Sequence, residues 1–264
     1  MDLNLKDKVV IVTGGGGLSG SIGETIVRHL ANEKAIPVII DKHPRGSQLA
    51  DELNNDGNKA FFVQADLRTD QGCKTAVEQT VSEFDRIDAL VNNLGINDRV
   101  GLENSYDDFI NSLKLNLAHF FGMTKYAAPY LKKSKGNIIN IASKVALTGQ
   151  GGTSGYAASK GGVLALTREW AAELSSSSVR VNALVIAESY TPAYEKWIQE
   201  FENPKEKLSS IVKKIPLEQR TTQTEEIADT VLLLLSNRSF HTTGQIIYVD
   251  CEYVYFDRTI SLIK

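Results

Sequence analysis

Seven short apolar runs recur along the chain, and the segments between most of them have the periodicity of a helix. The runs span residues 9–12, 37–40, 60–63, 89–91, 137–141, 179–185 and 245–249. The helical segments span 22–33, 47–55, 71–84, 106–131, a stretch around Tyr156, and 225–235. Continuous β-branched runs are typical of strands buried on both faces, and regular alternation with helices indicates a parallel sheet.

The length and composition allow either one large α/β core or two small domains, since the chain has 264 residues and is 42% hydrophobic. No linker rich in Pro, Gly or Ser divides it, and no internal repeat is evident. We therefore expect a single domain over residues 1–264. Right-handed crossovers would make it a Rossmann-type doubly wound parallel sheet with helices on both faces.

A glycine-rich loop from Thr13 to Gly23 follows the first apolar run and opens the first helix. Backbone amides at a helix N-terminus form an anion site, which predicts a bound dinucleotide pyrophosphate. The residues expected to contact the cofactor here are Gly14, Gly20, Ser21 and Ile22. A merely flexible turn is the alternative, but the strand before and the helix after favour the phosphate site.

Asp41 ends the second apolar run, eighteen positions after Gly23. A carboxylate at this place accepts hydrogen bonds from the adenosine ribose and repels a 2′-phosphate, which predicts NAD as the cofactor. Lys42 and Arg45 are also able to pair with a phosphate, so NADP stays an alternative. A turn-initiating role for Asp41 is compatible with the same position.

Tyr156 lies four residues before Lys160, and Ser143 lies thirteen residues before Tyr156. Residues four apart share one face of a helix, so the Lys160 ammonium is expected beside the Tyr156 phenol. A nearby cation favours phenolate, which predicts a lowered Tyr156 pKa and a general base for an alcohol. The pair alone is weak evidence, because it occurs by chance in many surface helices.

Taken together, these motifs resemble the short-chain dehydrogenase/reductase family over nearly the whole chain. The matching positions are Thr13-Gly14 to Gly23, Asp66-Leu67, Asn92-Asn93-Leu94-Gly95, Asn116, Ser143, Tyr156, Lys160 and Thr191-Pro192. The resemblance implies four catalytic residues, with Tyr156 as acid/base, Ser143 orienting the substrate oxygen, Lys160 lowering the Tyr156 pKa and binding the nicotinamide ribose, and Asn116 holding a relay water.

The same resemblance implies further cofactor contacts and an assembly. Asp66 and Leu67 would line the adenine pocket, Asn93 and Gly95 would shape the cofactor floor, and Ile186 and Thr191 would lie near the nicotinamide end. Helices at the place of residues 163–170 form oligomer interfaces in the family, which implies a homo-oligomer, specifically a tetramer.

Three segments depart from the family pattern. The glycine loop is three residues longer than usual, Ile186-Ala187 stands in place of Pro-Gly, and Asp250-Cys251-Glu252 stands in place of Asp-Gly-Gly. None of these changes removes a catalytic group. The longer loop leaves open which glycine meets the phosphate.

The loops expected around the substrate are polar. They offer Asp98, Lys144, Gln150, Glu188 and Trp197 as candidate substrate residues. Unpaired buried polar groups cost about 1–3 kcal/mol each, so a polyhydroxylated substrate fits better than a sterol or acyl chain. Solvent exposure is the alternative for each polar residue, and a place in the core of a lid helix is the alternative for Trp197.

Shorter segments resemble the bacterial L-fucose dehydrogenase-type members of the family. They include Asn97-Asp98, Ser143-Lys144, 148–151, 167–170, Ala187-Glu188 and 241–244. This resemblance implies NAD(P)-dependent oxidation of the anomeric hydroxyl of L-fucose or a related aldose to a lactone. The alternatives are a reductase of another carbonyl, such as a 3-oxoacyl or steroid-like ketone, and a non-catalytic nucleotide-sensing protein.

Bulk properties exclude several other classes of function. The net charge is −3 with scattered Lys and Arg, so we expect no nucleic-acid or anionic-membrane surface. Cys73 and Cys251 lack zinc spacing, so we expect no metal, and they suggest a reducing compartment. Residues 1–6 do not resemble a signal peptide, and the longest aliphatic run, 231–235, is too short to span a bilayer. A cytoplasmic protein is expected.

Overall fold

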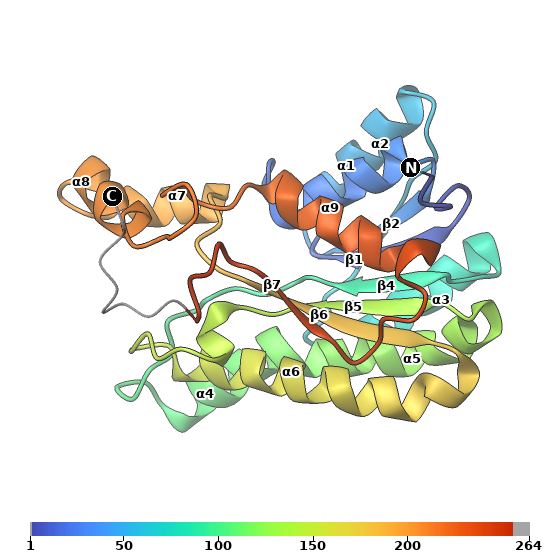
Figure 1. Cartoon of the computed structure of the whole chain (residues 1–264). Coiled ribbons are helices and arrows are strands. Elements are labelled where there is room, and N and C mark those ends of the chain that lie inside the picture. Colours follow the sequence, from blue (N-terminus) through green and yellow to red (C-terminus); the bar gives the residue numbers. More distant parts are fainter. Residues whose placement is uncertain (1, 256–264) are drawn as a thin grey trace.

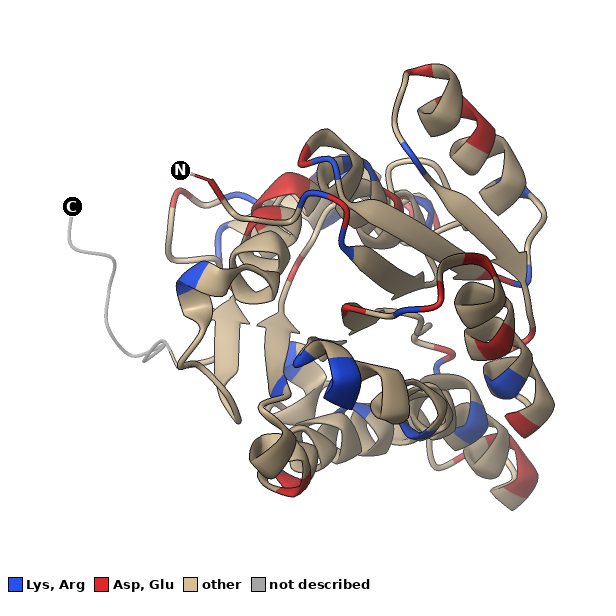
Figure 2. Cartoon of the chain, turned by 90° about the vertical axis from the view of Figure 1, so that its right-hand side faces the viewer, with Lys and Arg blue, Asp and Glu red and all other residues tan. Residues whose placement is uncertain are grey.

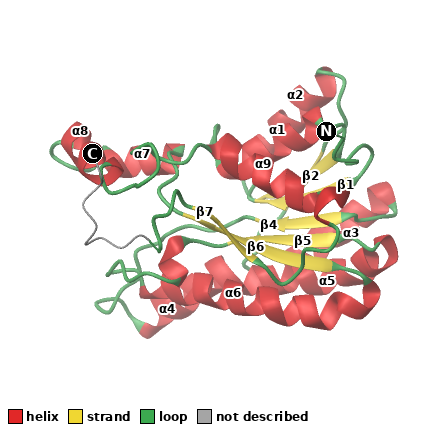
Figure 3. Ribbon diagram, in the orientation of Figure 1, coloured by secondary structure: helices red, strands yellow, loops and turns green. Residues whose placement is uncertain are grey.

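A computed structural model describes residues 2–255 and shows one α/β domain built on a seven-stranded sheet (Figure 1, Figure 3). All neighbouring strands are parallel, in the order β3-β2-β1-β4-β5-β6-β7. The strands are β1 (Val9–Thr13), β2 (Ile36–Asp41), β3 (Phe61–Gln64), β4 (Ala89–Asn92), β5 (Asn137–Ile141), β6 (Arg180–Ile186) and β7 (Ile246–Val249). The doubly wound fold expected from the sequence is confirmed; Met1 and 256–264 of the expected domain lie outside the described residues.

Two helical layers cover the two faces of the sheet (Figure 1). One layer contains α1 (Ile22–Asn32), α2 (Arg45–Asn55) and α9 (Thr224–Leu235). The other contains α3 (Asp70–Phe84), α4 (Tyr106–Leu113), α5 (His119–Ser134) and α6 (Ser154–Leu174). Each layer buries its apolar stripe against one face of the strands, which explains why the strand sequences are apolar throughout.

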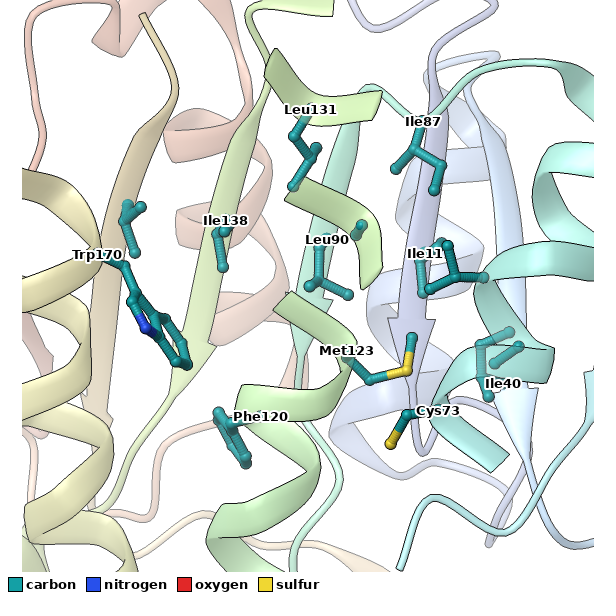
Figure 4. Packing of buried hydrophobic residues seen from close by; sticks show 14 of the residues in the cluster. Ile11, Ile40, Cys73, Ile87, Leu90, Phe120, Met123, Leu131, Ile138 and Trp170 are labelled. Carbon is teal, nitrogen blue, oxygen red and sulfur yellow. The ribbon is translucent and has the colours of Figure 1, made fainter. Parts of the chain in front are cut away.

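The two faces of the sheet form separate hydrophobic cores. Figure 4 shows the core beneath α3, α5 and α6, where Ile11, Leu90 and Ile138 from three strands meet Phe120 and Met123 from α5. Burying one such side chain contributes about 1.5–3 kcal/mol. These cores hold the carboxyl ends of the strands in fixed positions.

The chain order reverses between β1 and β4, which pair side by side although β2 and β3 lie between them in sequence. Ligands of open α/β sheets bind at such a switch point, outside the carboxyl ends of the strands. Here β1 ends in Thr13 and β4 in Asn92, both fully buried. The glycine loop and the 93–95 segment therefore start next to each other.

Two short helices, α7 (Pro192–Ile198) and α8 (Pro204–Val212), project beyond the carboxyl ends of the strands (Figure 1). They follow β6 and form a lid over the same edge. Backbone bonds between Glu188 and Thr222 and between Tyr190 and Thr222 fasten the base of this lid. The lid and the switch point thus lie at the same edge of the sheet, beyond the carboxyl ends of the strands.

Charged residues of both signs are interspersed over the outer helices and loops, and the strands are largely free of them (Figure 2). Among residues 2–255, no helix has the length and apolarity needed to cross a membrane. Within the same range, no cluster of three His, Cys, Asp or Glu side chains is placed to hold a metal ion.

Candidate active site

The glycine loop brings the chain from β1 into α1 by a very close approach. Gly14 has φ of +70°, and a Cβ added at Gly23 would overlap the Gly14 carbonyl oxygen and come within 2.7 Å of Asn93 Nδ2. Ser21 caps α1, and its hydroxyl accepts a hydrogen bond from the Glu24 amide at 3.4 Å. The first-turn amides of α1 have no intrahelical partner, so they face the side on which a phosphate would bind.

Thr13 and Asn93 join this loop to the end of β4. The Thr13 hydroxyl accepts hydrogen bonds from the amides of Asn93 at 2.9 Å and Leu94 at 3.1 Å. The Asn93 side chain in turn donates to the Thr13 carbonyl at 2.9 Å. Asn93 thus lies at the floor where the sequence predicts it.

Asp41 is 9% exposed and turns its carboxylate toward the glycine loop. It accepts hydrogen bonds from the amides of Gly16 at 3.2 Å and His43 at 2.9 Å. These two bonds fix the carboxylate at the carboxyl end of β2. Its negative charge is therefore held at the corner expected for the adenosine ribose.

The other expected cofactor residues lie around the same edge, but not all present their side chains to it. Asp66 forms an ion pair with Arg68 at 2.5 Å, and the Leu67 side chain is buried in the hydrophobic core. Ile186 ends β6. Thr191 caps α7, since its hydroxyl accepts a hydrogen bond from the backbone amide of Tyr194. Pro192 lies beside Gly20, so the lid reaches the glycine loop.

Ser143, Tyr156 and Lys160 gather at the carboxyl end of β5. Ser143 follows this strand and forms a hydrogen bond with the Tyr156 phenol. Lys160 is 2% exposed, and its Nζ donates to the Ile141 carbonyl at 2.7 Å. The same Nζ lies 5.6 Å from the centroid of the Tyr156 ring. The spacing in the sequence therefore places all three groups correctly.

The acidity of Tyr156 differs from the expectation. The pKa of Tyr156 is raised to about 12, chiefly by burial, with a smaller contribution from the Asp98 charge, and the hydrogen bond with Ser143 only partly offsets these effects. Burial also lowers the pKa of Lys160 to about 7, so this lysine is only partly charged at neutral pH. The predicted lowering of the Tyr156 pKa is wrong for this site, because desolvation is the largest effect on the phenol and raises its pKa.

Asn116 lies in η1 (Lys114–Ala118), a π-helical turn between α4 and α5. Its Oδ1 accepts a hydrogen bond from the Ile96 amide at 2.8 Å, and its buried Nδ2 finds no partner among the described residues. A buried donor of this kind is normally satisfied by an ordered water. The arrangement fits the relay water expected of Asn116.

His119 is a site residue that sequence reasoning missed. Its Nε2 donates to the Leu94 carbonyl at 3.1 Å, which ties η1 and α5 to the cofactor floor. Burial and the Lys160 charge lower the His119 pKa to about 3, so the ring stays neutral. Its position three residues after Asn116 was the signal available in the sequence.

Lys144 and Glu188, two of the expected substrate residues, form an ion pair with each other. The Tyr194 hydroxyl donates to the second carboxylate oxygen of Glu188 at 2.9 Å, and burial beside this carboxylate raises the Tyr194 pKa. Lys144 also lies over the ring of Tyr253, 4.1 Å from its centroid. These residues form a polar wall next to Ser143.

The remaining expected substrate residues differ in how near they lie to Tyr156. Asp98 accepts a hydrogen bond from Ser112 at 3.0 Å and lies close enough to Tyr156 to influence its pKa. Gln150 is exposed on a glycine-rich loop. Trp197 packs edge-on against Tyr194 and Phe201, which supports the alternative of a lid-core residue.

These residues fit a nicotinamide dinucleotide. A Cβ at Gly95 would come within 3.1 Å of Lys160 Nζ and 3.3 Å of Asn116 Oδ1, so the absence of a side chain at Gly95 leaves room beside Lys160. The α1 N-terminus would hold the pyrophosphate, Asp41 the adenosine ribose, and Lys160 the second ribose. The residues at the carboxyl ends of the strands are therefore suited to holding a nicotinamide dinucleotide.

Comparisons with known proteins agree with this geometry. A family model described as enoyl-(acyl carrier protein) reductase matches residues 17–253. The 3-oxoacyl-(acyl-carrier-protein) reductase FabG of Thermotoga maritima is 33% identical over 252 residues, covering 94% of this chain and 98% of that protein. The L-fucose dehydrogenase of Bos taurus is 35% identical over 243 residues, covering 91% of this chain and 87% of that protein.

A solved structure titled Cj0485 dehydrogenase is also similar, with a TM-score of 0.93 and 44% identity. The match covers 98% of this chain and 99% of that chain. Sequence relatives, structural likeness and the grouped Ser143, Tyr156 and Lys160 all lead to one conclusion. The chain belongs to the short-chain dehydrogenase/reductase family, whose members are NAD(P)-dependent oxidoreductases acting on CH–OH groups.

Proposed function

We propose that the protein is a sugar dehydrogenase that uses NAD to oxidise the anomeric hydroxyl of L-fucose or a related aldose to the lactone. The observation that carries the proposal is the polar wall of Lys144, Glu188 and Tyr194 beside the Ser143–Tyr156 pair. These groups are paired with one another, and their charged and hydroxyl atoms offer further hydrogen bonds to a ring with many hydroxyls, whereas an acyl chain would add none. The relative named L-fucose dehydrogenase supports the same substrate class.

In the proposed reaction, the Ser143 hydroxyl holds the substrate oxygen and the Tyr156 oxygen takes its proton. The cofactor, when bound, would accept the hydride from the substrate carbon that carries this oxygen. In its protonated form Lys160 would stabilise the Tyr156 phenolate beside it, and Asn116 would hold a water that passes the proton taken up by Tyr156 on to solvent. General-base catalysis of this kind contributes about 10²–10⁴-fold to a rate.

We propose NAD rather than NADP because of Asp41. Its carboxylate is fixed at the end of β2 by the amides of Gly16 and His43. A 2′-phosphate at this corner would meet a negative charge that has little room to move. A ribose 2′-hydroxyl would instead donate a hydrogen bond to it.

Substitution of the catalytic tyrosine tests the proposal. Tyr156→Phe should lower turnover of L-fucose by at least about 10²-fold and leave the dissociation constant for NAD nearly unchanged, since only the proton acceptor is lost. Tyr126→Phe is the matched control, because it removes a phenol on α5 that bonds Asp70 away from the site. Near-normal turnover by Tyr156→Phe would contradict the assignment.

A substrate panel separates the proposed function from its competitors. Nicotinamide reduction would be followed with L-fucose, L-galactose, D-arabinose and non-sugar alcohols, each with NAD and NADP. The relative named 3-oxoacyl-(acyl-carrier-protein) reductase favours a carbonyl reductase as the second candidate. Activity confined to 3-oxoacyl substrates would support that candidate, and calorimetry showing no binding of either dinucleotide would support a nucleotide-sensing protein.

The assembly and location belong to the same proposal. A homotetramer is inferred from the family resemblance, and the exposed Tyr106 and Phe121 on the layer of α4, α5 and α6 are consistent with further contacts. Sedimentation equilibrium would measure the mass. The cytoplasmic location is proposed because Cys73 and Cys251 are both free.

A further inference from the structure

The extended glycine loop is fastened to α2 by one arginine. The Arg45 guanidinium donates from Nη1 to the Gly17 carbonyl at 3.0 Å and from Nη2 to Glu24 Oε2 at 2.8 Å. A Cβ at Gly16 would approach the Gly46 Cα to 2.7 Å, so the loop and the first turn of α2 are in direct contact. Arg45 therefore bridges the loop, α1 and α2.

Glu24 is the buried partner that holds Arg45 in this place. It is 3% exposed and accepts hydrogen bonds from Arg28 Nε at 2.8 Å as well as from Arg45. A buried carboxylate keeps its charge only when it is paired in this way. Arg28 forms a second ion pair, with Glu52. Among the described residues, Arg45 forms its ion pair with Glu24.

The same contacts place Arg45 at the corner that recognises the adenosine ribose. Asp41 accepts a bond from the Gly16 amide, and Arg45 donates to the carbonyl of the next residue, Gly17. In dinucleotide folds an acidic residue at this corner selects the 2′-hydroxyl, and a nearby free arginine accommodates a 2′-phosphate. Here the two ends of the arginine fork are already occupied.

We propose that Glu24 is a specificity-determining residue, which makes the site selective for NAD by withholding Arg45 from a 2′-phosphate. The proposal rests on the proposed function of the chain as an NAD-dependent dehydrogenase. Asp41 supplies the repulsion, and Glu24 engages Arg45, one of the two cations near this corner, the other being Lys42. Both effects act against NADP, and neither touches the reacting atoms.

Neutralising Glu24 tests this role. In Glu24→Gln, the dissociation constant for NADP should fall at least about tenfold, since Arg45 is released to form a charge-assisted hydrogen bond with the 2′-phosphate, and that for NAD should change little. Adding Arg45→Ala to Glu24→Gln should abolish the gain. Arg28→Gln is the matched control, because it removes the other partner of Glu24 and leaves Arg45 in place. Equilibrium titrations with each dinucleotide would give the constants.

A gain that persists without Arg45, an equal gain in Arg28→Gln, or no gain in Glu24→Gln would overturn the proposal. Arg45→Met tests it independently if Glu24→Gln fails to fold, as judged by circular dichroism. The ratio of NADP to NAD affinity should then stay at the wild-type value, because Arg45 does not serve the phosphate. A tenfold loss of affinity for NADP alone would show that Arg45 binds the 2′-phosphate in the wild-type protein, which contradicts the proposal.

Dinucleotide binding by the wild-type protein distinguishes a failure of the proposed function from a failure of the inference about Glu24. If it binds neither dinucleotide, the proposed function fails and takes the role of Glu24 with it. If it binds NADP as tightly as NAD, the dehydrogenase assignment stands and the inference about Glu24 is wrong.

Discussion

Two neighbours pull the acidity of Tyr156 in opposite directions. The Ser143 hydroxyl lowers the pKa of the phenol through a hydrogen bond, and the Asp98 charge raises it. Asp98 is held toward the site by Ser112 on α4. The acidity of Tyr156 is therefore set first by burial and then by Ser143 and Asp98, which lie on different loops.

This opposition predicts the pH dependence of alcohol oxidation. The phenolate is the active base, so kcat/KM should rise with pH toward the Tyr156 pKa. Asp98→Asn should move this rise to lower pH, because a negative charge that favours the protonated phenol is lost. Ser143→Ala should move it to higher pH by about one unit, because a bond that favours phenolate is lost. Profiles of kcat/KM measure both, and shifts in the same direction would refute the assignment.

At the scale of residues, the sequence predicts positions better than environments. The spacing of Ser143, Tyr156 and Lys160 places them together, as the structure shows. The raised pKa of Tyr156 was not predictable, because it depends on burial by distant segments. The Lys144–Glu188 pair joins residues 44 positions apart, and no local pattern reports such a contact.

At the scale of elements, the junction of the glycine loop with α1 depends on the absence of a side chain at Gly23. A Cβ there would overlap the Gly14 carbonyl oxygen and crowd Asn93. Gly23→Ala should therefore displace the α1 N-terminus and weaken NAD binding by about tenfold or more, with a loss of about 1–3 kcal/mol of stability from overpacking. Calorimetric titration and urea unfolding measure the two effects.

Gly161 is the matched control in α6, because a Cβ there would meet nothing within 4 Å. Gly161→Ala should raise stability by about 0.5–1 kcal/mol through helix propensity and leave NAD binding unchanged. If both variants bound NAD like the wild type, the close approach at Gly23 would have no functional consequence.

The strands and most helices follow from the hydrophobic pattern alone, since each expected apolar run overlaps a strand in the structure to within one residue at each end. The segment 106–131 is different, because the sequence predicts one long helix and the structure inserts the π-helical turn η1 within it. That turn carries Asn116, whose Oδ1 bonds the Ile96 amide. The insertion depends on a tertiary contact, which a period of 3.6 residues does not reveal.

At the scale of the whole molecule, the catalytic and structural ends of the sheet are separate. The site occupies the carboxyl ends of the strands, and Arg180 begins β6 at the opposite edge. Arg180 is 8% exposed and donates to the carbonyls of Leu234 at 2.7 Å, Ser236 at 3.2 Å and Thr242 at 3.3 Å. One guanidinium thus joins β6, the end of α9 and the segment that leads to β7.

This separation predicts a variant that loses stability without losing catalysis. Arg180→Met would remove the hydrogen bonds from one charged donor to three carbonyl oxygens, which would keep their weaker neutral donors from Ser239 and Asn182. The loss should cost about 1.5–3 kcal/mol of unfolding free energy. Arg238→Gln is the control, because the exposed side chain of Arg238 makes a single described bond, to the Asp2 carbonyl at 3.1 Å, and its loss should change stability by less than about 0.5 kcal/mol. Urea unfolding at fixed protein concentration measures both. Below the transition, the folded Arg180→Met protein should keep the wild-type kcat/KM, and a selective loss of turnover would show that the two edges of the sheet are coupled.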